Sequence, residues 1–262
     1  MSMKFDVLTL FPEQVSDFFN TGITGRACKE GLIELNTVNI RDFSNDKHKS
    51  VDDYPYGGGA GMLMMPGPVY DAYKSLEPLP DTRVIYVTPT GRTFDQQYAK
   101  ELASEKELVF ICGHYEGIDE RVIDRLVTDR ISIGDYILTG GELPSLVIMD
   151  SVSRMIEGVL GNSESGITES FSDDLLEYPQ YTRPQNWMGC EVPDVLLSGD
   201  HAMVDEWRLE RSLETTRLVR PELYEKWANK HPEYFEKKLK QEKKAAEKER
   251  KRLKKLANSR DL

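Results

Sequence analysis

Three short glycine-rich stretches are the part of the sequence best suited to holding a ligand. They read VTPTG at 87–91, CGHYEG at 112–117 and SIGDYILTGGELP at 132–144. Glycine has no Cβ, so backbone N–H and C=O groups can approach a bound molecule closely there. None of the stretches has the P-loop pattern or the G-x-G-x-x-G dinucleotide fingerprint. The expected chemistry is recognition of a ligand by backbone groups, without one of the usual nucleotide motifs.

Strands and helices alternate through the first 160 residues and place these stretches at strand ends. Apolar runs such as VIYV and LVFIC are typical of strands in a parallel sheet that is covered on both faces. Strands are predicted within 4–11, 32–40, 82–91, 107–117 and 129–141, and helices within 12–31, 93–105, 118–127 and 142–160. Ligands of open α/β sheets bind outside the carboxyl ends of the strands, so the three stretches are expected to form one site. Periodicity alone would favour a doubly wound sheet.

Two further segments interrupt or follow this pattern. The connection 41–67 is long and contains Gly57, Gly58, Gly59 and Gly61, which is typical of a functional or mobile loop. Beyond residue 161 the sequence becomes small, polar and acidic, and then helical, with helices predicted in 201–219, 221–231 and 236–257. The predicted domains are 1–161, a flexible linker 162–174, and a smaller all-α domain 175–262.

Composition excludes several classes of protein. The 262 residues are 39% hydrophobic and 30% charged, without an apolar run of about 20 residues or a signal-peptide pattern. A cytoplasmic globular protein with no membrane partner is expected. Three widely spaced cysteines favour neither a disulfide framework nor a zinc site. The net charge of −11 combines +6 over residues 233–262 with −17 elsewhere. The basic tail is explained by intrahelical Glu–Lys pairs, and a contact with tRNA is the alternative.

Seven motifs, in order and over about residues 1–225, resemble the bacterial tRNA (guanine-N1)-methyltransferase (TrmD) family. They are YPYGGGAGMLM, YVTPTG, CGHYEGIDERV, SIGDYILTGGELP, DSVSRMI, YPQYTRP and LLSGDHAMVDEWR. The resemblance implies an α/β fold of the SPOUT class, in which a parallel sheet flanked by helices contains a trefoil knot. It also implies a homodimer, S-adenosyl-L-methionine as methyl donor, and methylation of guanosine 37 of tRNA, next to the anticodon.

The resemblance assigns the donor site to the three glycine-rich stretches. By motif, the donor contacts are Val87, Thr88, Pro89, Gly113, Glu116, Ser132, Ile133, Gly134, Asp135, Tyr136, Ile137, Leu138, Gly140, Gly141 and Pro144. For an isolated Gly-Gly pair, the end of a strand and the start of a helix would be the simpler explanation. Three such loops on neighbouring strand ends favour the ligand site.

The resemblance also implies a general base and a cation. Guanine N1 carries a proton that must be removed, and a cation near O6 can stabilise the charge that develops. The cation is Arg154 in DSVSR, and the base is the carboxylate before Ser170-Phe171. That residue is Glu169 here, whereas the family commonly has Asp. Asp173 and Asp174 are alternative bases, and solvated linker acids and a helix-surface arginine are the alternatives without catalysis.

The candidate contacts to tRNA are spread over the chain. They are Asp52, Tyr115, Ser170, Arg183 and His201. Carboxylates can accept hydrogen bonds from guanine edges, and an aromatic surface can receive a base that is turned out of its stack. Asp52 could instead cap its loop, and Tyr115 could be a packing residue. The family suggests Mg²⁺, but no spacing in this sequence locates a metal ligand set.

Two other functions remain compatible with these motifs. One is a knotted ribose 2′-O-methyltransferase, whose chemistry would not need a carboxylate aimed at a purine edge. The other is a non-catalytic tRNA- or nucleotide-binding module that retains donor binding but has lost turnover at Glu169.

Overall fold

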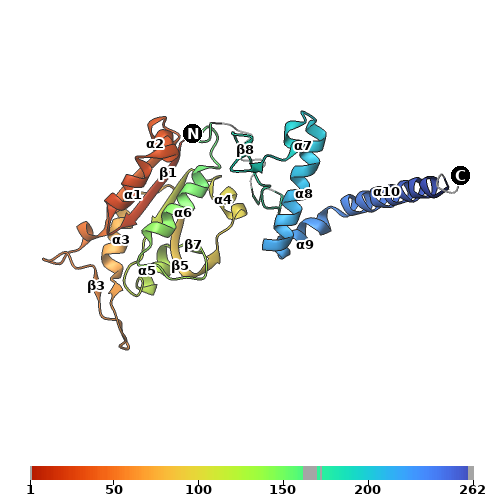
Figure 1. The fold of residues 1–262 in the computed structure, drawn as a ribbon. Helices are drawn as coiled ribbons and strands as arrows, with labels where there is room; N and C mark the ends of the chain where they lie inside the picture. Colours follow the sequence, from red (N-terminus) through yellow and green to blue (C-terminus); the bar gives the residue numbers. More distant parts are fainter. Residues whose placement is uncertain (1, 162–169, 172, 259–262) are drawn as a thin grey trace. The chain divides into compact units, whose positions relative to one another are not determined.

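The computed structural model describes residues 2–161, 170–171 and 173–258 (Figure 1). The chain divides into two compact units, Met1–Gly166 and Ile167–Leu262. Each unit has its own set of secondary-structure elements, and each is described by itself below. Among the described residues, no helix combines the length and the apolar character that crossing a membrane requires.

A five-stranded parallel sheet forms the centre of the first unit. Its order is β2-β1-β6-β5-β7, and every neighbouring pair is parallel. The strands are β1 (Met3–Thr9), β2 (Ile33–Asn39), β5 (Arg83–Thr93), β6 (Glu107–Ile111) and β7 (Asp129–Ser132). Successive side chains of a strand point to opposite faces, and all five residues of β6 are buried. The strand is therefore covered on both sides, as its continuous apolar sequence predicts.

Helices cover both faces of this sheet (Figure 1). Phe5 of β1 and Phe110 of β6 belong to the hydrophobic cluster on one face, and Leu8 and Val109 of the same strands belong to the cluster on the other. The first face carries α1 (Pro12–Phe19), α2 (Gly22–Lys29), α4 (Gln96–Leu102) and α6 (Glu142–Ser153). The second carries the 3₁₀ helix η1 (Ile40–Phe43), α3 (Pro66–Ser75) and α5 (Glu120–Leu126). The parallel sheet flanked by helices confirms this part of the predicted fold.

The predicted helix 12–31 is wrong in one respect, because the structure has two helices there. The break between α1 and α2 lies at Asn20 and Thr21, and Gly22 follows with a φ of +63°, a conformation that favours glycine. Gly25 lets α2 pass close to the end of α1. A Cβ at this position would lie 2.6 Å from the carbonyl carbon of Asn20.

The long connection 41–67 also contains more structure than its composition predicts. Strands β3 (Asp52–Asp53) and β4 (Leu63–Met64) pair in an antiparallel hairpin, whose loop holds the four glycines. Helix α3 then begins at Pro66 and is not among the predicted elements. Proline fits the first turn of a helix, where backbone N–H groups have no partner within the helix.

A partly buried carboxylate, Asp129, links β7 to β5 and α4. It accepts hydrogen bonds from Arg83, Tyr98 and Thr128, with 3.0 Å from Arg83 Nε and 2.5 Å from the Tyr98 hydroxyl. Burial raises the pKa of Asp129, but the hydrogen bonds from Arg83, Thr128 and Tyr98 outweigh burial and lower this pKa to about 2. The ionised form is therefore the one that stabilises the fold.

Replacing Asp129 by Asn is expected to lower the free energy of unfolding at pH 7 by about 2 kcal/mol. A carboxyl whose pKa is lowered on folding stabilises the protein above its ordinary pKa, and this contribution is lost as the pH falls toward 2. Urea unfolding between pH 7 and pH 3 should show a shallower acid loss in the variant. Asp124→Asn is the control, because that exposed ion pair with Arg130 contributes little. An acid profile identical to that of the native protein would contradict the assignment.

The second unit is mainly helical. Its helices are α7 (Asp194–Leu197), α8 (His201–Val219), α9 (Pro221–Lys230) and α10 (Pro232–Asn258). Helix α8 has the predicted bounds because Asp200 caps it, accepting hydrogen bonds from the backbone N–H groups of Ala202 and Met203. The all-α prediction needs one correction, a short hairpin of β8 (Asn186–Trp187) and β9 (Cys190–Glu191). Its turn contains Met188 and Gly189, both with positive φ, which the apolar periodicity of the sequence does not reveal.

Candidate active site

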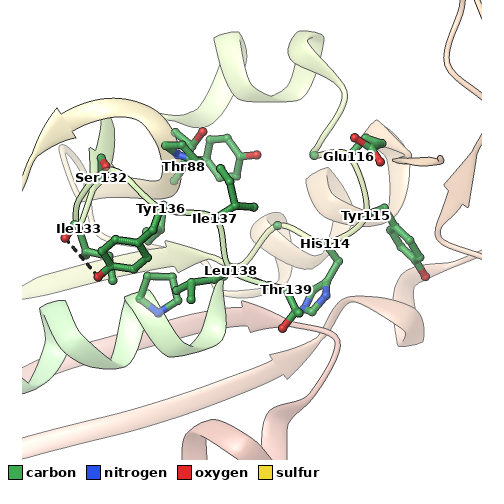
Figure 2. A pocket seen from close by; sticks show the side chains of 18 of the residues that line it. Thr88, His114, Tyr115, Glu116, Ser132, Ile133, Tyr136, Ile137, Leu138 and Thr139 are labelled. Atoms are coloured by element: carbon green, nitrogen blue, oxygen red, sulfur yellow. Dashed lines mark hydrogen bonds between the residues drawn. The ribbon is translucent and has the colours of Figure 1, made fainter. Parts of the chain in front are cut away.

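One cavity in the first unit lies where β6, β5 and β7 end. These three strands are neighbours in the sheet, so the loops after them meet at its carboxyl edge. The cavity has a volume of about 290 Å³ (Figure 2). Its lining residues are Tyr86, Val87, Thr88, Pro89, Gly113, His114, Tyr115, Glu116, Gly117, Ser132, Ile133, Gly134, Tyr136, Ile137, Leu138, Thr139, Gly140, Gly141 and Pro144. The three glycine-rich stretches therefore form one site, as their strand-end positions predict.

The first wall is a bulge in β5. Val87 and Arg92 both pair with Ile131 of β7, so residues 88–91 leave the strand and return to it. Thr88 and Pro89, which lie in this bulge, line the cavity. Gly91 closes the bulge against β7, since a Cβ at this position would lie 2.4 Å from the backbone nitrogen of Ile131.

The second wall, the loop after β6, connects the cavity with the glycine-rich hairpin β3–β4. The backbone N–H of Glu116 donates to the carbonyl of Met62 at 3.0 Å, and the N–H of Met64 donates to the carbonyl of Gly117 at 2.9 Å. A Cβ at Gly61 would lie 2.4 Å from Cγ of Glu116. The hairpin thus lies directly beside the cavity, and Gly61 leaves room for the Glu116 side chain.

Tyr115 stands at the mouth of the cavity on the same loop. Its φ is +59°, which is uncommon for a residue with a side chain, and its ring is 47% exposed. The Tyr115 hydroxyl accepts a hydrogen bond from Arg41 at 3.4 Å. Figure 2 shows the ring next to Glu116, at the edge of the labelled group. An exposed aromatic face at this position can receive a planar group.

The third wall is the stretch 132–141, which crosses the end of β6. The backbone N–H of Gly141 donates to the carbonyl of Gly113 at 2.9 Å. A Cβ at Gly141 would lie 2.7 Å from Cα of Cys112 and 2.8 Å from the backbone nitrogen of Gly113. Only glycine allows this contact between two backbones. Within the stretch, the Tyr136 hydroxyl donates to the carbonyl of Ile133 at 3.4 Å (Figure 2).

A buried carboxylate, Glu142, links this third wall to the neighbouring strands. Glu142, the first residue of α6, accepts a hydrogen bond from the Thr9 hydroxyl at 2.6 Å, and both of its oxygens lie 2.8 Å from Nε2 of His114. Burial raises the pKa of Glu142, but the hydrogen bonds from His114 and Thr9 outweigh burial and lower this pKa. Negative charge is also favourable at the N-terminus of a helix. The carboxylate therefore joins the ends of β1, β6 and α6 into one framework behind the cavity.

Most of the predicted donor contacts lie at the cavity, and Asp135 is the exception. Fourteen of the fifteen line it, whereas Asp135 is exposed beside it. Five lining residues are absent from the predicted donor set: Tyr86, His114, Tyr115, Gly117 and Thr139. Tyr115 is among the predicted tRNA contacts. All of the five except Tyr86 fall inside the three glycine-rich stretches, so the bounds of these stretches could have found them.

Arg154 does not line the cavity. It follows the last residue of α6, whose first turn carries the lining residue Pro144. Ten helical residues separate the two, which corresponds to about 15 Å. Within one chain, Arg154 and the cavity are therefore at opposite ends of α6.

The remaining predicted residues that the structure describes are not among those that line the cavity. Asp52 pairs with Met64 in the hairpin β3–β4. In the second unit, the Ser170 hydroxyl accepts a hydrogen bond from the backbone N–H of Glu177 at 2.9 Å. Arg183 and His201 are both exposed, and His201 begins α8. Glu169 lies outside the described residues.

Over the part of the chain that the structure describes, no group of three or more His, Cys, Asp or Glu side chains is arranged to hold a metal ion. The cavity is a mixed surface in which backbone groups of five glycines stand beside Ser132, Thr88 and Glu116. Such a surface suits a small molecule that has both polar and apolar parts.

A family model and the individual relatives that match this chain all carry the same description. The model of one protein family, described as tRNA (Guanine-1)-methyltransferase TrmD, matches residues 3–226. Proteins named tRNA (guanine-N(1)-)-methyltransferase are 57% identical in Lachnospira eligens and 54% identical in Clostridioides difficile, over 87% and 86% of this chain and 98% of each relative. The protein of that name from Staphylococcus carnosus is 55% identical over 86% of this chain and 92% of its own length.

Proposed function

This chain belongs to the tRNA (guanine-1)-methyltransferase TrmD family, and on that premise we propose that it transfers a methyl group from S-adenosyl-L-methionine to N1 of guanosine 37 of tRNA. The family makes it an S-adenosyl-L-methionine-dependent tRNA methyltransferase enzyme. The position of the guanosine, the residues that act on it and the cytoplasm as the place of the reaction are parts of the proposal.

The observation that carries the proposal is the cavity at the ends of β6, β5 and β7. Five of its lining residues are glycines, and a Cβ at Gly140 would lie 2.3 Å from Cε1 of His114, while one at Gly141 would lie 2.7 Å from Cα of Cys112. Backbone N–H and C=O groups can recognise an adenine edge, while Thr88, Ser132 and Glu116 offer polar contacts. These residues fit S-adenosyl-L-methionine, which supplies an electrophilic methyl group when bound. The crossing of the 132–141 stretch over the end of β6 supports a trefoil-knotted chain.

The reaction requires removal of the proton from guanine N1. We assign this step to the carboxylate of Glu169 and the stabilisation of negative charge at O6 to the guanidinium of Arg154. In this scheme N1 bonds to the methyl carbon while the bond from that carbon to the sulfonium sulfur breaks, and S-adenosyl-L-homocysteine leaves. Glu169 accepts the N1 proton, so the methylated guanine is neutral. The additional methylene of Glu, relative to Asp, lengthens the reach of this carboxylate.

Asp173 and Asp174, the alternative bases, have structural partners within the second unit. Asp173 accepts a hydrogen bond from the indole N–H of Trp227 at 3.0 Å. Asp174 forms ion pairs with Lys226 and Lys230. Burial raises the pKa of Asp174, but the hydrogen bonds from these lysines outweigh burial and lower it. A carboxylate held in this way is a weak proton acceptor, which favours Glu169.

The separation of Arg154 from the cavity supports a homodimer with a shared active site. Arg154 is separated from the cavity by about 15 Å along α6, which is too far for one chain to bring its own Arg154 to the methyl group. Large apolar side chains are exposed on α1 and α6, which pack against each other: Phe18 on α1, and Leu143 and Val147 on α6. Exposed apolar patches of this kind mark interfaces. We propose that a second copy covers this face and brings its own Arg154 to the cavity.

The tRNA is proposed to contact both units. We propose that Tyr115 at the cavity mouth stacks on the guanine once it is turned out, and that Asp52 in the neighbouring hairpin accepts hydrogen bonds from the guanine edge. Ser170, Arg183 and His201 are proposed to position the tRNA from the second unit. The described residues offer no ligand set for Mg²⁺, so we assign it no ligands in this chain.

The function is tested by mass spectrometry of tRNA nucleosides after incubation of the protein with S-adenosyl-L-methionine and an unmodified tRNA transcript that contains guanosine 37. N1-methylguanosine is the expected product, and a transcript with adenosine at position 37 should yield none. A 2′-O-methylated nucleoside would instead indicate ribose chemistry. Donor binding without any product would indicate a binding module. Repeating the assay with EDTA tests the dependence on a divalent ion.

A further inference from the structure

Helix α10 lies beyond the part of the chain that matches the family. The match ends at residue 226, whereas α10 spans Pro232–Asn258 (Figure 1). Its 27 residues correspond to a length of about 40 Å. They include eleven Lys and Arg against five Glu, in a chain whose net charge is −11. The helix therefore concentrates positive charge on an otherwise acidic protein.

The start of α10 packs on the second unit by one face. The Phe235 ring lies edge-on to Tyr224 and Trp227, at centroid distances of 6.4 Å and 6.1 Å. Lys238 Nζ lies 3.0 Å from the Glu210 carboxylate of α8. Leu239, one turn after Phe235, continues the apolar face. These contacts fix which side of the helix faces the body of the unit.

Four exposed lysines follow one another along a different face, which we call the lysine row: Lys237, Lys240, Lys244 and Lys251. Their spacings of three, four and seven residues keep them on one side of an α-helix. At 100° per residue, this side lies roughly opposite Phe235 and Leu239. The row extends over about 21 Å and faces away from the packed side.

Exposed ion pairs do not neutralise this row. Lys251 lies 2.9 Å from the Glu247 carboxylate, in a pair whose two side chains are 74% and 66% exposed. Pairs of this kind contribute only about 0–1 kcal/mol, so a phosphate group can compete with the carboxylate. Glu233 and Glu236 likewise precede Lys237 and Lys240 by four residues, so intrahelical pairs can form along the row, but exposed pairs are weak enough for phosphate groups to replace them.

We propose that the lysine row of α10 binds phosphate groups of the substrate tRNA, outside the methylation site. This inference rests on the proposed function, which makes tRNA the partner. The substrate carries one negative charge per nucleotide, whereas the protein outside the basic tail is acidic overall. A row of ammonium groups along an exposed helix matches a phosphate backbone without reading sequence, because each Lys acts as a point charge.

The test is the affinity of the full-length protein for an unmodified tRNA transcript, measured by fluorescence anisotropy between about 50 and 200 mM salt. Replacing Lys237, Lys240, Lys244 and Lys251 together by Gln is expected to raise the dissociation constant at least about tenfold. The slope of log affinity against log salt should become shallower by about 2 to 4, since each lost phosphate contact removes about one counterion.

The matched control replaces four exposed lysines of the first unit, Lys29, Lys74, Lys100 and Lys106, by Gln. It changes the net charge by the same amount and should leave the salt slope unchanged. An equal loss of affinity in both variants would show that net charge alone acts, and would overturn the proposal. Native tRNA affinity in the variant that lacks the four lysines of the row would also overturn the proposal. The same holds for a loss of affinity that accompanies dissociation of the protein, as measured by analytical ultracentrifugation.

Failure of this inference can be distinguished from failure of the proposed function. If the native protein makes no N1-methylguanosine, the function fails, while direct binding still reports on the lysine row. If the variant without the lysine row methylates saturating tRNA at the native rate but requires more tRNA to reach that rate, both the proposed function and the role of the lysine row are supported. A native kcat and a native KM for tRNA in that variant would leave the proposed function intact and would refute the binding of tRNA by the lysine row.

Discussion

Replacing Glu169 by Gln is expected to slow methyl transfer to tRNA by about 100-fold or more. Gln has nearly the same size as Glu and keeps a hydrogen-bonding oxygen, but its amide cannot take the proton of guanine N1. Donor affinity should not change, because the cavity is built from the loops after β6, β5 and β7. Single-turnover transfer measures the chemical step, and calorimetric titration with S-adenosyl-L-methionine measures donor binding.

Asp173→Asn is the matched control, since it neutralises a nearby carboxylate whose contact is with Trp227. This variant should transfer the methyl group at close to the native rate, with some loss of thermal stability. If the Asn variant loses transfer and Glu169→Gln retains it, the base is Asp173 and the assignment made above is wrong. The pH dependence adds a check, because the rate of the Gln variant should no longer fall as the pH is lowered through the titration of the base.

The second large effect is expected from Gly141→Ala, which should abolish measurable donor binding. The Gly141 backbone has φ −84° and ψ −9°, a conformation that alanine adopts readily, so the effect must come from contact alone. A Cβ 2.7 Å from Cα of Cys112 meets backbone, which cannot rotate away as a side chain can. The 132–141 stretch would have to shift, and a shift of about 1 Å costs on the order of 100-fold in function.

Gly67→Ala is the control for this variant. Gly67 lies in α3, and a Cβ there would meet nothing within 4 Å. Circular dichroism and thermal melting separate a local change at the cavity from loss of the fold. A Gly141→Ala protein that binds the donor normally would show that the two backbones can separate without consequence, contrary to the proposed site.

Mixing two inactive variants tests the shared site. Arg154→Ala retains the donor cavity, and Gly141→Ala retains Arg154. If each site combines one cavity with the partner's Arg154, random reassociation should restore about one quarter of native activity, because half of the dimers would hold one complete site. No recovery, in a mixture shown to exchange subunits, would place both groups in the same chain.

The parallel sheet could be predicted from the sequence because its signals are local. Runs such as VIYV and LVFIC identify buried strands, and Asp200 marks the start of α8 as an N-cap. The meeting of three loops at one edge also follows, since strand ends in such sheets share an edge. The family resemblance then supplied a candidate ligand for that edge.

Contacts between distant parts of the chain could not be predicted in the same way. Thr9 and Glu142 are 133 residues apart, and neither has a local pattern that indicates their hydrogen bond. The break in 12–31 depends on the close approach of Gly25 to Asn20, whereas apolar spacing there continues through the break. Helix α3 begins at Pro66 and contains Gly67 and Pro68, residues that usually indicate a turn.

The glycines in the walls of the cavity have a consequence for inhibition under the proposed function. Because a Cβ at Gly140 or Gly141 would lie less than 3 Å from neighbouring atoms, substitutions at these two positions would disturb the chain itself as well as the cavity. A compound held at these positions through backbone hydrogen bonds would be hard to exclude by mutation, since a change that excludes the compound would also exclude the proposed methyl donor.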